Sequence, residues 1–444
     1  MSGDRLRGRP SGAATAGGLL SSTMLAQLAV LAATVLSAAW LAPRDFALFG
    51  AALGLAGIVN SVNTLGIETR LAIVEVATMS RLLRTGLATC LGLTAAGGAA
   101  ALLLAASGRS LWAGVLAFAM AGSVISAFQQ IATTLALRAR RADVLMRSRV
   151  AQGCVNAVLI LALCASPLPG YVALSAAWVA STVVGLLVSL HGWAPPLPAS
   201  WRVREADISV TRAEVGLQPV TSLLAGVSSQ IPLVILPLVA SANLAGSWAL
   251  SSRILGAGVM AAFSALQPVY YATAAEYVRE HAFARVATWH RQWAIWLTAA
   301  TVPGFLLAGL VISYAMPLLG AQWLDARTLV APACIYWGSQ FFGLPLSQTL
   351  LLVGRIRLQL VWTVVRFVAA VAAFSLWPLW GASASIWAWA IVCAATYVVL
   401  TVLQARVLRR EAAAAQTPAA QPAAPMASGP EQVLTQADPA DRVS

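Results

Sequence analysis

The chain contains no lysine: all 28 of its basic residues are arginine, as is typical of a GC-rich genome. Charge of either sign is also scarce, because charged residues make up 10% of the 444 positions, against about 25% in an ordinary soluble protein. This scarcity excludes a soluble globular protein. Apolar residues make up 59% of the chain and form long runs from Gly17 to Leu408, which indicates a polytopic membrane protein.

Cysteine and histidine are too few and too scattered to build a metal or disulfide site. The five cysteines all fall inside apolar runs, no two of them form a CxxC pair, and the three histidines are not clustered. Isolated buried cysteines behave as small apolar residues. The sequence therefore predicts no disulfide framework, no metal centre and no cofactor.

Twelve apolar segments are long enough to cross a bilayer, which needs about 20 mainly apolar residues. The predicted spans lie near residues 17–41, 47–67, 85–106, 111–137, 145–166, 170–192, 215–240, 244–272, 292–318, 328–353, 356–379 and 382–408. The predicted fold class is therefore an all-α polytopic membrane protein. Residues 1–16 precede the first span, and residues 411–444, rich in Ala, Pro and Gln, are predicted to form a disordered tail.

The arginines are distributed unevenly between the connections. Alternate connections, starting with the N-terminus, hold 23 arginines, whereas those on the other side hold only Arg44, Arg109 and Arg327. Cytoplasmic loops carry an excess of basic residues, so this split predicts an even number of spans with both termini in the cytoplasm. The net charge of +13 is then an orientation signal, and no nucleic-acid partner is expected.

A weak internal repeat divides the chain into halves. The segment L41-A-P-R-D-F-A-L-F-G50 is similar to V239-A-S-A-N-L-A-G-S-W248, at an offset of 198 residues. With six spans on either side, the repeat favours two six-helix lobes, at residues 17–213 and 214–410, in the same membrane orientation. Two such lobes commonly form an alternating-access transporter with its site between them.

The same motifs carry a resemblance to a known family. The first repeat, L65-G-I-E-T-R70, A245-G-S-W-A-L-S-S-R-I-L255, P345-L-S-Q-T-L350 and G354-R-I-R357 resemble segments of bacterial polysaccharide and O-antigen flippases. These belong to the multidrug/oligosaccharidyl-lipid/polysaccharide exporter (MOP) superfamily. The resemblance implies twelve helices in two lobes around a central cavity. It also implies translocation of a lipid-linked, polyprenyl-diphosphate oligosaccharide across the bacterial inner membrane, with membrane lipids and polysaccharide polymerase or assembly proteins as partners.

Two arginines fall inside predicted spans. Arg253 is the only charged residue between Glu214 and Glu276, and it lies about 15 Å from the end of its span, near the bilayer midplane. An arginine at that depth costs about 2.5–3.5 kcal/mol on insertion scales, so it needs a wet cavity or a partner. A substrate cavity and a structural role, with the guanidinium bonded to helix carbonyls, both stay open. Arg366 either lines the cavity or snorkels to the cytoplasmic rim.

Other polar residues are weaker candidates for substrate binding. Arg70 lies at the inner end of the second span, where a cavity role competes with a rim ion pair and positive-inside anchoring. Gln230 lies in the middle of the seventh span, and Asn63 shares a helix face with Asn60. For both amides, hydrogen bonding between helices competes with ligand binding. Trp323 lies near a predicted membrane interface, as expected of an aromatic belt.

Three functions remain at this stage. A flippase for an anionic lipid-linked substrate explains the arginines at membrane depth. A drug exporter of the same superfamily usually needs a buried carboxylate to bind a cation, yet only Glu68 lies even near a span. A membrane enzyme, such as a polymerase or ligase, usually needs acid–base residues or a large outer loop, and the outer loops carry only Asp45, Asp325 and three arginines. The sequence therefore favours a flippase over an enzyme.

Overall fold

The computed structural model describes residues 12–71, 74–139, 141–191 and 203–416, which are almost entirely helical and contain no strand. The longer helices of the first half are α1 (Gly12–Ala38), α2 (Pro43–Asn63), α4 (Val76–Ala106), α5 (Ser110–Arg138), α6 (Ala142–Cys164) and α7 (Gly170–Leu190). Those of the second half are α9 (Gln218–Val239), α10 (Ala242–Arg279), α11 (Phe283–Ala315), α12 (Arg327–Gly343), α14 (Ile356–Ser375) and α15 (Trp377–Gln416). Short elements are α3 (Glu68–Leu71), α8 (Glu205–Val215), α13 (Thr349–Leu352) and the 3-10 turns η1 (Met316–Leu319) and η2 (Ala321–Ala326).

The twelve predicted spans correspond one to one with the twelve long helices of the described residues, which confirms the predicted fold class. Ten helices in the described part of the chain are long and apolar enough to cross a membrane. The other two are α12, with 17 residues, and α1, whose apolar stretch Met24–Ala38 is shorter. The predicted break near residue 381 is also present, because Gly381 interrupts α15 with a φ of 80°.

Several boundaries differ from the prediction. The tenth span was expected to reach residue 353, but α12 ends at Gly343 and turns lead to α13. Pro345 explains the early end, because proline lacks the N–H that would continue the hydrogen bonds of the helix. The predicted tails also change: residues 12–16 belong to α1 and residues 411–416 to α15, while the rest of both tails lies outside the described residues.

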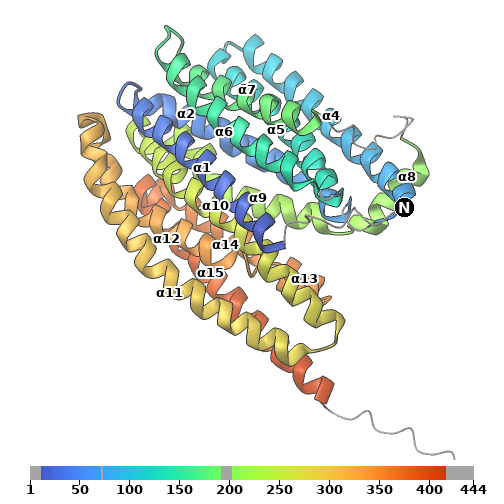
Figure 1. Cartoon of the computed structure of the whole chain (residues 1–444). Coiled ribbons are helices and arrows are strands. Elements are labelled where there is room, and N and C mark those ends of the chain that lie inside the picture. The colour runs from blue at the N-terminus through green and yellow to red at the C-terminus, as the bar shows by residue number, and fades with distance from the viewer. Residues whose placement is uncertain (1–11, 72–73, 140, 192–202, 417–444) are drawn as a thin grey trace, which may run out of the picture.

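The helices form two groups that meet along α1, α2, α9 and α10 (Figure 1). We call the group α1–α7 the N-lobe and the group α9–α15 the C-lobe. The two repeat segments lie at the starts of α2 and α10, and these two helices pack against each other across the boundary. The internal repeat therefore coincides with two of the helices through which the lobes touch.

Small residues let the lobes approach closely. On α2, Gly50 faces Ala249 of α10, whereas Gly54 faces Leu233 of α9; a Cβ at Gly50 would lie 2.7 Å from the Ala249 Cβ. On α10, a Cβ at Gly246 would lie 2.0 Å from the carbonyl oxygen of Pro43. Membrane helices pack by such small-residue contacts because lipid supplies no hydrophobic drive for association.

Trp323 joins the two lobes at the end of the molecule that is predicted to face away from the cytoplasm. We call this end the outer end. Trp323 is fully buried, donates its Nε1–H to the Ala38 carbonyl at 2.9 Å, and meets the Phe46 ring edge-on at 5.4 Å. Trp323 belongs to η2 of the C-lobe, whereas Ala38 and Phe46 belong to the N-lobe. The expectation that Trp323 joins an aromatic belt was therefore wrong, because the ring is buried between the lobes.

Candidate functional site

A central cavity of about 380 Å³ lies where the two lobes meet. Helices α1, α2, α6 and α7 line it from the N-lobe, and helices α9, α10 and α12 line it from the C-lobe. Its polar lining residues are Gln27, Thr34, Arg149, Gln152, Asn156, Ser229, Gln230, Ser252 and Arg253. Aromatic side chains complete the wall, from Phe46, Phe49, Trp178, Trp248, Tyr336 and Trp337.

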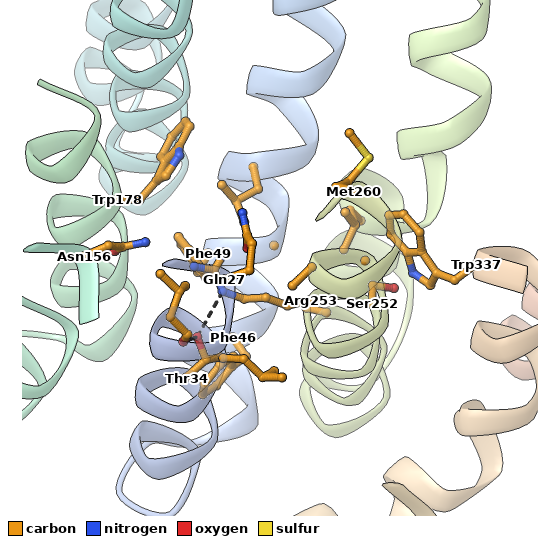
Figure 2. A pocket seen from close by; sticks show the side chains of 18 of the residues that line it. Gln27, Thr34, Phe46, Phe49, Asn156, Trp178, Ser252, Arg253, Met260 and Trp337 are labelled. Atoms are coloured by element: carbon orange, nitrogen blue, oxygen red, sulfur yellow. Dashed lines mark hydrogen bonds between the residues drawn. The ribbon is translucent and has the colours of Figure 1, made fainter. Parts of the chain in front are cut away.

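Arg253 extends from α10 towards the N-lobe wall of this cavity (Figure 2). Its Nε–H donates to the Thr34 hydroxyl at 3.3 Å, and its guanidinium carbon lies 4.8 Å from the centre of the Phe49 ring. Both contacts cross the boundary between the lobes, since Thr34 is on α1 and Phe49 is on α2. Stacking on a ring leaves the edge of a guanidinium free for oxygen acceptors, so Arg253 is placed to contact a ligand in the cavity.

Arg149 is a second cavity arginine that sequence reasoning missed as a site residue. Arg149 is exposed on α6 and lines the central cavity from the N-lobe, whereas Arg253 lines it from the C-lobe. Among the described residues that line this cavity there is no aspartate or glutamate. The cavity therefore presents two guanidinium groups without a lining carboxylate to neutralise them, which favours an anionic ligand.

Three further polar atoms in this wall are buried and lack a hydrogen-bond partner among the described residues. They are the Asn156 Oδ1, the Ser252 Oγ and the Trp337 Nε1. Buried polar groups are nearly always satisfied, and such exceptions point to a ligand, to water or to a rearrangement that supplies the missing partner. Asn156 and Trp337 lie on opposite sides of Arg253 in Figure 2.

Arg366 lies apart from the cavity, inside the C-lobe. It is 4% exposed, donates to the Tyr397 hydroxyl at 2.9 Å, and stacks on the rings of Tyr397 and Trp362 at 4.6 and 5.6 Å. The Tyr397 hydroxyl in turn donates to Gln340 Oε1 at 2.9 Å. This network joins α14, α15 and α12, so the guanidinium neither lines the central cavity nor snorkels to the rim.

The remaining predicted site residues fall in three different places. Gln230 lines the central cavity beside Gly57, whose missing side chain leaves room for the amide. Asn63 is fully buried and donates to the carbonyl and hydroxyl of Ser123 on α5, at 3.2 and 3.1 Å. Arg70 is exposed on α3 and does not line the central cavity. Of the five, the structure brings only Arg253 and Gln230 together.

Several solved structures share this fold. An inward-facing multidrug resistance transporter of the MATE family, in the MOP superfamily, superposes with a TM-score of 0.63 at 15% identity, over 89% of this chain and 99% of that one. The lipid II flippase MurJ, in an inward closed conformation, gives a TM-score of 0.65 at 9% identity, over 89% and 90% of the two chains. A MOP superfamily transporter from Pyrococcus furiosus gives 0.55 at 13% identity, over 90% and 95%.

These likenesses define the fold. The chain has the same fold as solved MATE transporters of the MOP superfamily and the lipid II flippase MurJ, as the resemblance implied. No family model matches the sequence, and a search of curated proteins finds no match. The solved structures named above are two transporters and a flippase.

Proposed function

We propose that this protein is a flippase that moves a lipid-linked oligosaccharide, carried on a polyprenyl diphosphate, across the bacterial inner membrane. The oligosaccharide would serve surface or exopolysaccharide assembly, where a polymerase or assembly proteins take it over. The observation that carries the proposal is the central cavity, which is lined by Arg149 and Arg253 and by no described carboxylate.

The chemistry of a diphosphate fits this cavity. Guanidinium groups bind phosphate oxygens with two parallel hydrogen bonds, and these bonds are stronger where water is partly excluded. Because Arg149 and Arg253 belong to different lobes, a diphosphate bound by both contacts the two halves that alternating access moves apart. Gln230 adds an uncharged donor and acceptor to the same wall.

The other residues take supporting roles in this proposal. Arg366 and Asn63 hold helices together inside the C-lobe and the N-lobe through the hydrogen bonds described above. Arg70, at the end of the N-lobe predicted to be cytoplasmic, attracts anionic head groups towards the entrance. Both chain termini lie in the cytoplasm, as the arginine distribution predicts.

A drug exporter is the second candidate, because MATE transporters share the fold. Two arginines repel the organic cations that such a pocket would have to bind, and no described lining carboxylate of the central cavity offsets them. The transporter from Pyrococcus furiosus is itself described as having a binding pocket of reverse polarity that suggests a different function. The charge of the cavity therefore favours the flippase.

A strain lacking this protein tests the proposal. Its lipid-linked oligosaccharides are extracted, and their membrane side is determined with a non-permeant reagent. Complete units trapped on the cytoplasmic side support the flippase. Incomplete units, or complete units already facing outward, contradict it and place the block in synthesis or in later assembly.

A further inference from the structure

A second cavity, of about 350 Å³, lies within the N-lobe and differs in chemistry from the central one. Its wall contains amide side chains from Asn60, Gln129 and Gln130, threonine hydroxyls that include Thr133, and the carboxyl group of Glu68. This volume lies in the range of about 300–1,000 Å³ that is typical of ligand pockets. We call it the N-lobe polar cavity.

The two cavities are neighbours. Arg149, Gln152 and Trp178 line both of them, so they form one shared wall between the central cavity and the N-lobe polar cavity. Gln152 is held in place, since its Oε1 accepts from Gln129 Nε2 at 2.8 Å and its Nε2 donates to the Thr182 hydroxyl at 3.4 Å. A ligand with two chemically different parts can therefore place one part in each cavity.

The lining of the N-lobe polar cavity suits a sugar better than an ion. Amides and hydroxyls both donate and accept hydrogen bonds, as sugar hydroxyls do, and a carboxylate accepts from two neighbouring hydroxyls. The indole of Trp178 offers an apolar face to a sugar ring. A bare cation is disfavoured, because the single carboxyl group of Glu68 shares the wall with the guanidinium of Arg149.

We propose that the sugar attached directly to the diphosphate binds in the N-lobe polar cavity, while the diphosphate lies between Arg149 and Arg253. This inference rests on the proposed function and adds a carbohydrate subsite to it. Gln130 and Thr133 contact the sugar hydroxyls, and Trp178 packs against the ring. Arg149 sits at the junction and contacts the first phosphate.

The test compares two lipids on the purified full-length protein in nanodiscs. One is a polyprenyl diphosphate, and the other is the same lipid carrying a single N-acetylhexosamine. The variants are Gln130→Leu and Thr133→Val, which remove hydrogen-bonding groups while keeping similar volume. Gln322→Leu is a matched control, because Gln322 is an exposed amide in η2 that lines neither cavity.

Each cavity variant is expected to weaken binding of the glycosylated lipid about tenfold, since about 1.4 kcal/mol of lost hydrogen bonding corresponds to that factor. Binding of the bare diphosphate should stay within twofold, and Gln322→Leu should change neither lipid. Trp178→Phe, which keeps an aromatic ring, should weaken only the glycosylated lipid, and less than Gln130→Leu does. Arg253→Ala should weaken both lipids.

The contrary results are distinct. If the cavity variants bind the glycosylated lipid as tightly as the wild type, the N-lobe polar cavity holds only water and the subsite is wrong, while the proposed function stands. If they weaken both lipids equally, the residues act on the fold or on the diphosphate, and the subsite is again wrong. If the wild-type protein binds neither lipid, the proposed function itself fails and the subsite fails with it.

Discussion

Arg149 and Arg253 line one cavity from opposite lobes, Arg149 from α6 and Arg253 from α10. Of these two arginines, only Arg253 has a described polar contact across the boundary, its hydrogen bond to Thr34. An anion that engages both guanidinium groups joins the lobes more tightly than either arginine does alone. In the proposed function, the pair therefore links recognition of the diphosphate to the relative position of the lobes.

Replacing Arg253 by alanine should reduce flipping at least tenfold without reducing the amount of protein in the membrane. A hydrogen bond to a charged group contributes about 1.5–3 kcal/mol, which corresponds to about 10- to 150-fold in affinity. Arg149→Gln should have a similar effect, and Arg253→Lys a smaller one, because lysine keeps the charge but loses the bidentate geometry. Complementation of a deletion strain measures the activity, and full activity of Arg253→Ala would overturn the role assigned to this arginine.

Replacing Trp323 by alanine should open the outer end. The change removes the hydrogen bond to Ala38 and the edge-on contact with Phe46, both of which hold the lobes together. In a background free of native cysteine, Ser229→Cys places a thiol on the wall of the central cavity, at a position that is partly exposed. A non-permeant maleimide added from outside should label this cysteine several times faster in Trp323→Ala.

Trp323→Phe is the matched control for that experiment, since it keeps an aromatic ring but loses the indole N–H. Its labelling rate should fall between those of the wild type and Trp323→Ala. Equal labelling in all three proteins would show that Trp323 does not close the outer end.

Replacing Arg366 by methionine should destabilise the protein rather than change its substrate preference. The change leaves the buried Tyr397 hydroxyl without this donor and removes two ring-stacking interactions, and a buried polar group left without its partner costs about 1–3 kcal/mol. Thermal unfolding in detergent should shift down by several degrees, and the ratio of affinities for glycosylated and bare lipid should not change. A selective loss of one lipid would instead place Arg366 in the substrate pathway.

Acid should loosen the contact between α8 and α4 of the N-lobe. The Asp207 carboxylate accepts two hydrogen bonds from Arg84, at 2.8 and 3.0 Å, and this arginine lowers the pKa of Asp207 below its ordinary value of 3.8. A lowered pKa in the folded state means that the contact stabilises the fold fully above about pH 4 and is lost as the pH falls further.

Asp207→Asn should reproduce that loss at neutral pH. At neutral pH, limited proteolysis near Glu205–Val215 should be faster in the variant than in the wild type. In strong acid the wild-type rate should rise, whereas the rate of the variant should stay the same. Identical proteolysis of the variant and the wild type at pH 7 would show that the ion pair does not hold α8 in place.

The fold could be predicted because its signals are local. Apolar length and arginine distribution indicated twelve spans, and a single charge in a long apolar stretch identified Arg253. Arg149 was missed because it ends the basic segment Arg138–Arg149, where an orientation signal and a cavity residue look the same. Arg149 lines the cavity because α6 packs beside α1 and α7, and this packing cannot be read from the sequence.

Depth along a helix did not determine which face a side chain occupies. Arg366 lies near the middle of α14, as a cavity residue would, but its side chain contacts Tyr397 on α15 inside the C-lobe. Asn63 likewise finds its partner in Ser123, which is 60 residues away in sequence. Such partners depend on the rotation of neighbouring helices, which a single sequence does not encode in any short motif.

Reconstitution into liposomes tests the central claim most directly. Purified protein is incorporated into vesicles that contain a polyprenyl-diphosphate oligosaccharide, and a non-permeant reagent that modifies sugars measures how much of the inner-leaflet pool becomes accessible. The wild-type protein should expose that pool, whereas Arg253→Ala and protein-free vesicles should leave it protected. If the wild-type protein leaves the pool protected yet moves an organic cation, the chain is a drug exporter and not a flippase.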